Sequence, residues 1–198
     1  MQNTGREGSA LKSPAAWVRF LAVVVAGTVL DLWSKHWAFL ALKNEETLWS
    51  KASLDALGRK LLCLEFIWQE NFGAVLGVGQ GRTAMFVGFT FLALALLTWL
   101  FVDSKRSHSG LHLFLGCVVA GAIGNLYDRM QFAYVRDFLR FTFRADWATW
   151  GGDSHYVWPY VFNIADVFIS VGVFGLFLVW LVSLIQHRQA TSKSAGRT

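Results

Sequence analysis

The chain has 198 residues, of which 55% are hydrophobic and only 16% charged, with a formal charge of +5 and a mean hydropathy of +0.42. Soluble domains usually carry about 25% charged residues, so this composition excludes a disordered chain and argues against an ordinary cytosolic domain. The two cysteines, Cys63 and Cys117, fall in an outer loop and in an apolar segment respectively, and we expect no disulfide framework.

Four long apolar segments follow one another along the chain. A bilayer core requires about 20 apolar residues per helix. We therefore predict an all-α membrane protein that forms one membrane-embedded domain over residues 1–198, with flexible tails at about 1–15 and 189–198. The predicted transmembrane helices cover residues 20–42, 83–102, 111–127 and 161–185. The first could be taken for a cleaved signal peptide, but three more spans follow it, and we interpret it as an uncleaved anchor.

The basic residues favour an orientation with both termini in the cytoplasm. With that orientation, the inner segments carry eight basic residues and only two acidic ones, whereas the outer segments carry nine of each. This distribution follows the positive-inside rule. We attribute the positive charge to topology and expect no nucleic-acid partner.

Two longer segments, 43–82 and 128–160, would then lie on the extracytoplasmic side. Residues 61–71 are rich in strand-forming residues, which predicts a small β-rich element between the first two spans. The later part of the second segment holds tryptophan and tyrosine residues that either favour the headgroup zone or pack a small domain outside the membrane. They are Trp147, Trp150, Tyr156, Trp158 and Tyr160.

Polar residues recur at selected places in the apolar segments, although an ionisable residue at the centre of a span costs about 2.5–3.5 kcal/mol. Asp31 and Lys35 stand at i and i+4 in the first span, which is the spacing of a helical ion pair. Others stand at i and i+3 where the third span ends and the fourth begins, namely Asn125 with Asp128 and Asn163 with Asp166.

The predicted topology brings these polar groups to one leaflet. They could be structural ion pairs and helix caps, or they could form a reactive site. Two nearby carboxyl groups share a proton, because like charges raise one pKa. One then acts as a base on water while the other polarises a carbonyl, which is hydrolysis of the aspartic type.

Five motifs in this order resemble the bacterial lipoprotein signal peptidase family, also called signal peptidase II. They span most of the chain between about residues 20 and 185. They read Asp31-x-x-x-Lys35, Asn71-x-Gly73-Ala74, Gly124-Asn125-Leu126-Tyr127-Asp128-Arg129, Val135-x-Asp137-Phe138 and Phe162-Asn163-Ile164-Ala165-Asp166. The resemblance implies an aspartic membrane endopeptidase without a metal or organic cofactor, and a fold of four helices with a small β-rich cradle.

By the same resemblance, the substrate is a prolipoprotein that is cut on the amino side of its diacylglyceryl-modified cysteine. We expect a monomer in contact with membrane lipid, located in the bacterial inner membrane with its site toward the extracytoplasmic leaflet. The catalytic pair maps to Asp137 and Asp166. The residues expected to bind substrate or support the site are Asp31, Lys35, Asn71, Gly73, Asn125, Asp128, Arg129, Asn163 and Ala165.

The chain also departs from the family pattern. Asp137 and Asp166 are 29 residues apart, which is longer than is usual in the family, and the excess lies in residues 144–159. This enlarged loop is either a lid over the acyl chains or an insertion without a role. The spacing also leaves open whether Asp128, and not Asp137, works with Asp166, although Arg129 beside Asp128 favours a structural ion pair there.

Other functions are possible from the sequence. The main alternative is a small membrane transporter or proton-pathway protein that uses intramembrane acids; an assembly subunit is another. Three local patterns are weaker indications of a zinc site, a hydrolytic triad and a serine–lysine peptidase. They are His108 with His112, Asp153-Ser154-His155, and Ser34-Lys35.

Overall fold

The computed structural model describes residues 8–44, 60–61, 63–73, 82–145 and 156–195. Among these residues, four helices are long and apolar enough to cross a membrane. They are α1 (Pro14–Ala38), α3 (Thr83–Asp103), α4 (Ser109–Phe132) and α5 (Ile164–Ala195). Their outward faces expose large apolar side chains such as Val29, Leu92, Trp99 and Phe174, which suits a lipid environment.

The four predicted spans are confirmed, with different ends. A short 3-10 turn (Ala10–Lys12) precedes α1, whose first turn starts with Pro14 and is capped by the Ser13 hydroxyl. Helical structure thus begins inside the segment 1–15 that was expected to be a tail, and α5 continues to Ala195, past the expected boundary at residue 189. At the other end of α1, a π-helical turn (Phe39–Asn44) continues the helix.

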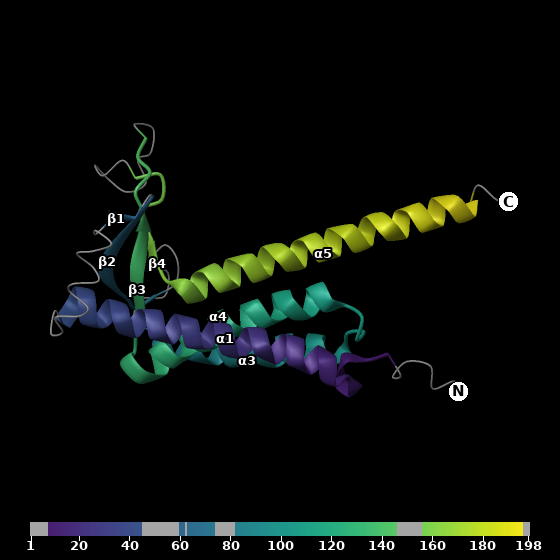
Figure 1. Ribbon diagram of the computed structural model, residues 1–198, viewed down its shortest axis with the longest axis horizontal. Coiled ribbons are helices and arrows are strands. Elements are labelled where there is room, and N and C mark those ends of the chain that lie inside the picture. Colours follow the sequence, from purple (N-terminus) through teal and green to yellow (C-terminus); the bar gives the residue numbers. More distant parts are fainter. Residues whose placement is uncertain (1–7, 45–59, 62, 74–81, 146–155, 196–198) are drawn as a thin grey trace.

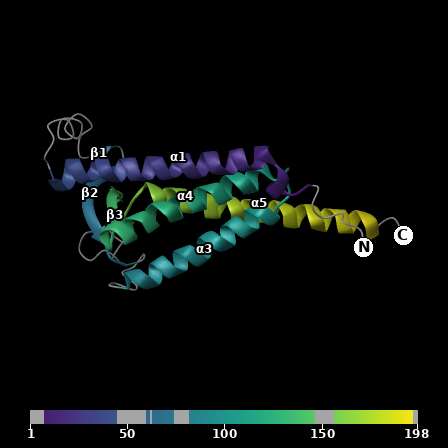
Figure 2. The ribbon, with the colours of Figure 1, turned by 90° about the horizontal axis from the view of Figure 1, so that it is seen from below.

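Helix α4 is the centre of the bundle and contacts α1, α3 and α5. Figure 2 shows it between α1 and α3, with α5 behind it. Glycines allow these close approaches: a Cβ atom on Gly121 would collide with the carbonyl oxygen of Ala165, and one on Gly124 would collide with the Asp31 carboxylate. The polar residues of α1, α4 and α5 therefore lie side by side.

A four-stranded antiparallel sheet lies at one end of the bundle, near the end of α1 and the start of α5 (Figure 1). Its strands β1 (Lys60–Leu61), β2 (Leu64–Asn71), β3 (Val135–Phe141) and β4 (Val161–Phe162) pair in sequence order. The strands expected between the first two spans are confirmed. The prediction was incomplete, however, because β3 comes from the second outer segment, β4 comes from the predicted start of the fourth span, and the fold is not purely helical.

Two ends of predicted spans were wrong, and both matter for the site. Helix α4 continues to Phe132, so that Asn125 and Asp128 lie inside the helix and not at its end. The fourth span begins at Ile164, because Val161 and Phe162 pair with β3 as a strand. The left-handed residue Ala133 ends α4, and the pairing of β4 with β3 delays the start of α5; hydropathy reports neither feature.

Candidate active site

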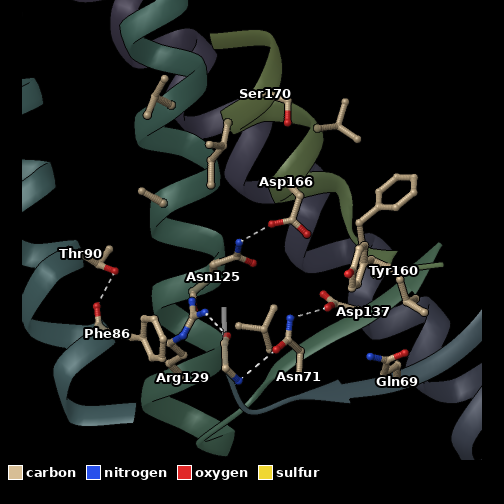
Figure 3. A pocket seen from close by; sticks show the side chains of 18 of the residues that line it. Gln69, Asn71, Phe86, Thr90, Asn125, Arg129, Asp137, Tyr160, Asp166 and Ser170 are labelled. Carbon is tan, nitrogen blue, oxygen red and sulfur yellow. Dashed lines mark hydrogen bonds between the residues drawn. The ribbon is translucent and has the colours of Figure 1, made fainter. Parts of the chain in front are cut away.

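A cavity of about 870 Å³ opens between the sheet and helices α3, α4 and α5 (Figure 3). Apolar side chains of the three helices line much of it, including Phe89, Leu97, Val118 and Val171. Its polar lining includes five residues that the sequence singled out. They are Asn71, Asn125, Arg129, Asp137 and Asp166.

Asp137 reaches the cavity from β3 and is 1% exposed. Both of its carboxyl oxygens accept hydrogen bonds from side-chain amides. Asn71 on β2 donates to Oδ2 at 2.9 Å, and Asn163 donates to Oδ1 at 2.6 Å. These contacts hold the carboxyl group in one orientation at the edge of the cavity.

Asp166 lies in the first turn of α5. The Asn163 side chain accepts a hydrogen bond from the backbone N–H of Asp166, and the Asp166 carboxylate accepts one from the backbone N–H of Asn163, each at 3.0 Å. This reciprocal pair is a capping box. The other oxygen of Asp166 accepts a hydrogen bond from the Asn125 amide at 2.9 Å. Asn163 is therefore both a helix cap and a direct contact of both aspartates.

Burial, followed by the nearby charge of Asp166, raises the pKa of Asp137 from its ordinary value of 3.8 to about 7. The amides of Asn71 and Asn163 oppose this shift because they stabilise the ionised form. A carboxyl group with this pKa is largely protonated below neutral pH. Perturbed pKa values of this kind are typical of groups that exchange protons during catalysis.

Behind the cavity wall lies a fully buried ion network centred on Lys35. Its ammonium group is 2.8 Å from Asp31 and 3.3 Å from Asp128, and all three side chains are fully buried. The ion pair expected at i and i+4 is confirmed. Lys35 also donates to Asn125 Oδ1 at 2.9 Å, which leaves the Asn125 NH₂ group to donate to Asp166.

The structure places Asp128 in this network and not in the lining of the cavity. Its carboxylate accepts hydrogen bonds from Arg136 at 2.7 Å and 3.1 Å through the guanidinium group, and at 2.9 Å through the backbone N–H. The sequence had suggested Arg129 as the partner, and this was wrong. Arg129 instead donates to the carbonyl oxygens of Asn125 and Gly73 at the cavity.

The remaining predicted residues also have defined places. The backbone N–H of Ala165 donates to Asp31 at 2.8 Å, which ties the start of α5 to α1. Gly73 lines the cavity, and its N–H donates to the Asn71 side chain. Sequence reasoning missed Arg136, although its position next to Asp137 on a strand directs it to the opposite face of the sheet.

The structure describes the two ends of the enlarged loop, up to residue 145 and from residue 156 onward. Arg144 bonds to the Tyr156 hydroxyl at 2.9 Å and joins the two ends of the loop, after which Trp158 and Tyr160 reach the cavity lining. The proposed lid residues Trp147, Trp150, Gly151, Gly152 and His155 lie outside the described residues, as does the Asp153-Ser154-His155 pattern.

The other local patterns do not form the sites considered for them. His112 is buried and lies within hydrogen-bond distance of Ser104, and the described residues contain no group of three or more His, Cys, Asp or Glu placed to hold a metal ion. Ser34 donates to the backbone of Asp31, while the Lys35 ammonium bonds elsewhere. Both cysteines are free.

Comparison with known proteins shows the family of the chain. The family profile described as signal peptidase (SPase) II matches residues 23–182. The chain is 31% identical to a lipoprotein signal peptidase of Rhodopirellula baltica over 87% of this chain and 75% of that protein. It is 34% identical to one of Caulobacter vibrioides over 82% of this chain and 85% of that protein.

The fold is also found in a solved structure, a bacterial membrane enzyme determined by the in meso method at 2.3 Å resolution. The TM-score is 0.62 at 21% identity, over 83% of this chain and 88% of that one. The family match covers all the residues from Asp31 to Asp166 that form the site. The chain therefore belongs to the signal peptidase II family of aspartic peptidases.

Proposed function

We propose that Asp137 and Asp166 are the catalytic pair that cleaves a prolipoprotein on the amino side of its diacylglyceryl-modified cysteine. The observation that carries this assignment is that both carboxyl groups line one cavity and both bond to Asn163. Asp128 is not a cavity-lining residue, and its carboxylate is occupied by Arg136 and Lys35. We therefore assign it a structural role.

In the proposed reaction, Asp137 holds the proton that the pair shares, and Asp166 is the base. Asp166 takes a proton from a water molecule, whose oxygen attacks the scissile carbonyl carbon. The protonated Asp137 donates a hydrogen bond to the carbonyl oxygen as negative charge develops there. Asp166 then gives its proton to the leaving nitrogen, and the C–N bond breaks. The pair thereby stores and returns one proton, and no external reagent other than water is consumed.

The supporting residues hold this pair in position. Lys35 fixes the amide orientation of Asn125, and Asn125 donates to Asp166. Asp31 anchors the first turn of α5 through the backbone of Ala165. These contacts are buried, so little reorganisation is needed when charge moves during the reaction.

The shape of the cavity suits a substrate that is part lipid and part polypeptide. Its helix-lined portion is apolar and would accept the acyl chains and the signal segment from the side. Binding energy from these remote groups would orient the peptide bond at the aspartates. We place the sheet and the site on the extracytoplasmic side, because the basic residues at the opposite end of the bundle, such as Lys105 and Arg106, favour the cytoplasm. We propose that one copy of the chain forms the complete site.

The test is a reaction of the purified protein with a synthetic diacylglyceryl-modified prolipoprotein, analysed by mass spectrometry. We expect a product whose first residue is the modified cysteine. The same peptide without the diacylglyceryl group tests the lipid requirement. No cleavage of the modified substrate under conditions where the protein remains folded would contradict the proposal.

A further inference from the structure

The pairing of β2 with β3 contains a register shift close to the site. Phe66 is opposite Leu139, and Gln69 is opposite Asp137, so three steps along β2 correspond to two along β3. With regular pairing, Trp68 would have been opposite Asp137. An extra residue of this kind redirects the side chains that follow it, and such bulges are frequent next to active sites.

The shift brings Gln69 beside Asp137. Residues directly opposite each other on antiparallel strands project to the same face, with Cβ atoms about 4.5–5.5 Å apart. Gln69 is exposed and lines the cavity, and Figure 3 shows it together with Asn71 near Asp137. Two amide side chains on the same face of β2 therefore lie near the Asp137 carboxyl group.

The two amides differ in what they contact. The Asn71 NH₂ group donates to Asp137, and its oxygen accepts the N–H of Gly73. No described residue forms a hydrogen bond with the Gln69 side chain, so the described part of the chain leaves its NH₂ donors and its carbonyl acceptor open to a ligand. One donor and one acceptor are what a peptide group of an extended substrate requires.

The position of Gln69 in the cavity determines which part of the substrate its side chain can contact. It belongs to the sheet side of the cavity, away from the apolar helix-lined portion that suits the acyl chains and the signal segment. The polypeptide that follows the modified cysteine has to leave the membrane, and it would pass along the sheet. We infer that Gln69 is a positioning residue that binds the backbone of the segment following the modified cysteine. This inference rests on the proposed function.

The test compares two substrates that differ only after the modified cysteine. One continues for several residues, and the other ends there as an amide. For Gln69→Ala we expect kcat/KM to fall about fivefold on the long substrate, mainly through KM, with no change on the short one. Gln131→Ala is the matched control, because Gln131 is exposed at the end of α4 and does not line the cavity. It should leave both substrates unaffected.

Two results would overturn the inference. Equal losses on both substrates would mean that Gln69 acts on the catalytic pair or on folding, and not on the following segment. Unchanged kinetics on both would mean that the side chain does not contact the substrate. Failure of the wild-type enzyme to cleave either substrate would instead refute the proposed function itself, which separates the two proposals.

Discussion

Asp137 and Asp166 are both hydrogen-bonded to Asn163. The side-chain amide of Asn163 donates a hydrogen bond to Asp137, and its backbone N–H donates one to Asp166. Asp137 belongs to the sheet and Asp166 to α5. Asn163 lies between β4 and α5, so the connection between strand and helix also fixes the relative position of the two carboxyl groups.

Replacing Asn163 by alanine should therefore affect both aspartates. We expect kcat to fall about 10²-fold, because small displacements of reacting groups have effects of this size. The Asn163 amide also lowers the pKa of Asp137, so its loss should move the alkaline limb of the pH–rate profile to higher pH. Steady-state kinetics across pH would measure both effects. A loss of rate with an unmoved limb would contradict the direct contact with Asp137.

The pKa of Asp137 predicts how the rate depends on pH. With a value of about 7, the fraction of Asp137 that holds a proton declines above neutral pH. We expect the rate to fall up to tenfold per pH unit on the alkaline side, since the mechanism requires this proton. A rate that stays constant to pH 9 would contradict the assignment of Asp137 as the proton donor.

The same shift also predicts a pH dependence of stability. A carboxyl group with a raised pKa in the folded state contributes stability below its ordinary pKa of 3.8, and this contribution is lost as pH rises through about 7. Asp137→Asn is neutral throughout and removes the effect. We expect the thermal midpoint of the variant, relative to wild type, to increase between about pH 4 and pH 7. A constant difference would contradict the raised pKa.

Replacing Asp128 by asparagine should act on stability. Its carboxylate and the Arg136 guanidinium are almost completely buried, and Lys35 is also a partner. Removing one member of a buried ion pair typically costs about 3–5 kcal/mol. Glu65→Gln is the matched control, because it breaks a pair with Arg140 that is partly exposed on the same sheet, and it should cost about 1 kcal/mol or less.

The measurement for this pair of variants is thermal unfolding together with the cleavage rate per folded molecule. Asp128→Asn should unfold at a clearly lower temperature than Glu65→Gln. If Asp128→Asn instead lost activity as completely as Asp137→Asn while its stability was unchanged, Asp128 would have to be a catalytic residue.

The packing of α4 against α5 predicts that alanine substitutions at two glycines differ in their effect on stability. A Cβ atom on Gly121 would meet the backbone carbonyl of Ala165, which cannot move without shifting the first turn of α5. Gly121→Ala should therefore destabilise the protein by about 1–3 kcal/mol and lower the cleavage rate. Gly88→Ala is the control, since nothing lies within 4 Å of the added atom. Equal thermal midpoints for the two variants would contradict the close contact.

The sequence predicted the features that depend on local pattern. Long apolar segments indicate the spans, and the i, i+4 spacing indicates the Asp31–Lys35 pair, because both follow from the geometry of one helix. The position of Asp137 and Asp166 at one cavity followed from the family motifs together with the predicted topology.

Features that depend on pairing between distant segments were not predictable in this way. The partnership of Asp128 with Arg136 requires α4 to end at Phe132, where Ala133 has a positive φ of 66° and lets the chain turn into β3. The position of Gln69 depends on a register shift that strand propensity does not reveal. Neither the turn at Ala133 nor the register shift in β2 can be recognised from hydropathy or from the spacing of motifs.

The most direct test of the catalytic pair is the cleavage rate of three single variants on a diacylglyceryl-modified prolipoprotein. Asp137→Asn and Asp166→Asn should each reduce the rate at least about 10³-fold while the protein still folds and inserts into membranes. Asp103→Asn, which changes an exposed carboxylate at the opposite end of α3, should match wild type. Substantial cleavage by a folded Asp137→Asn or Asp166→Asn variant would contradict the account.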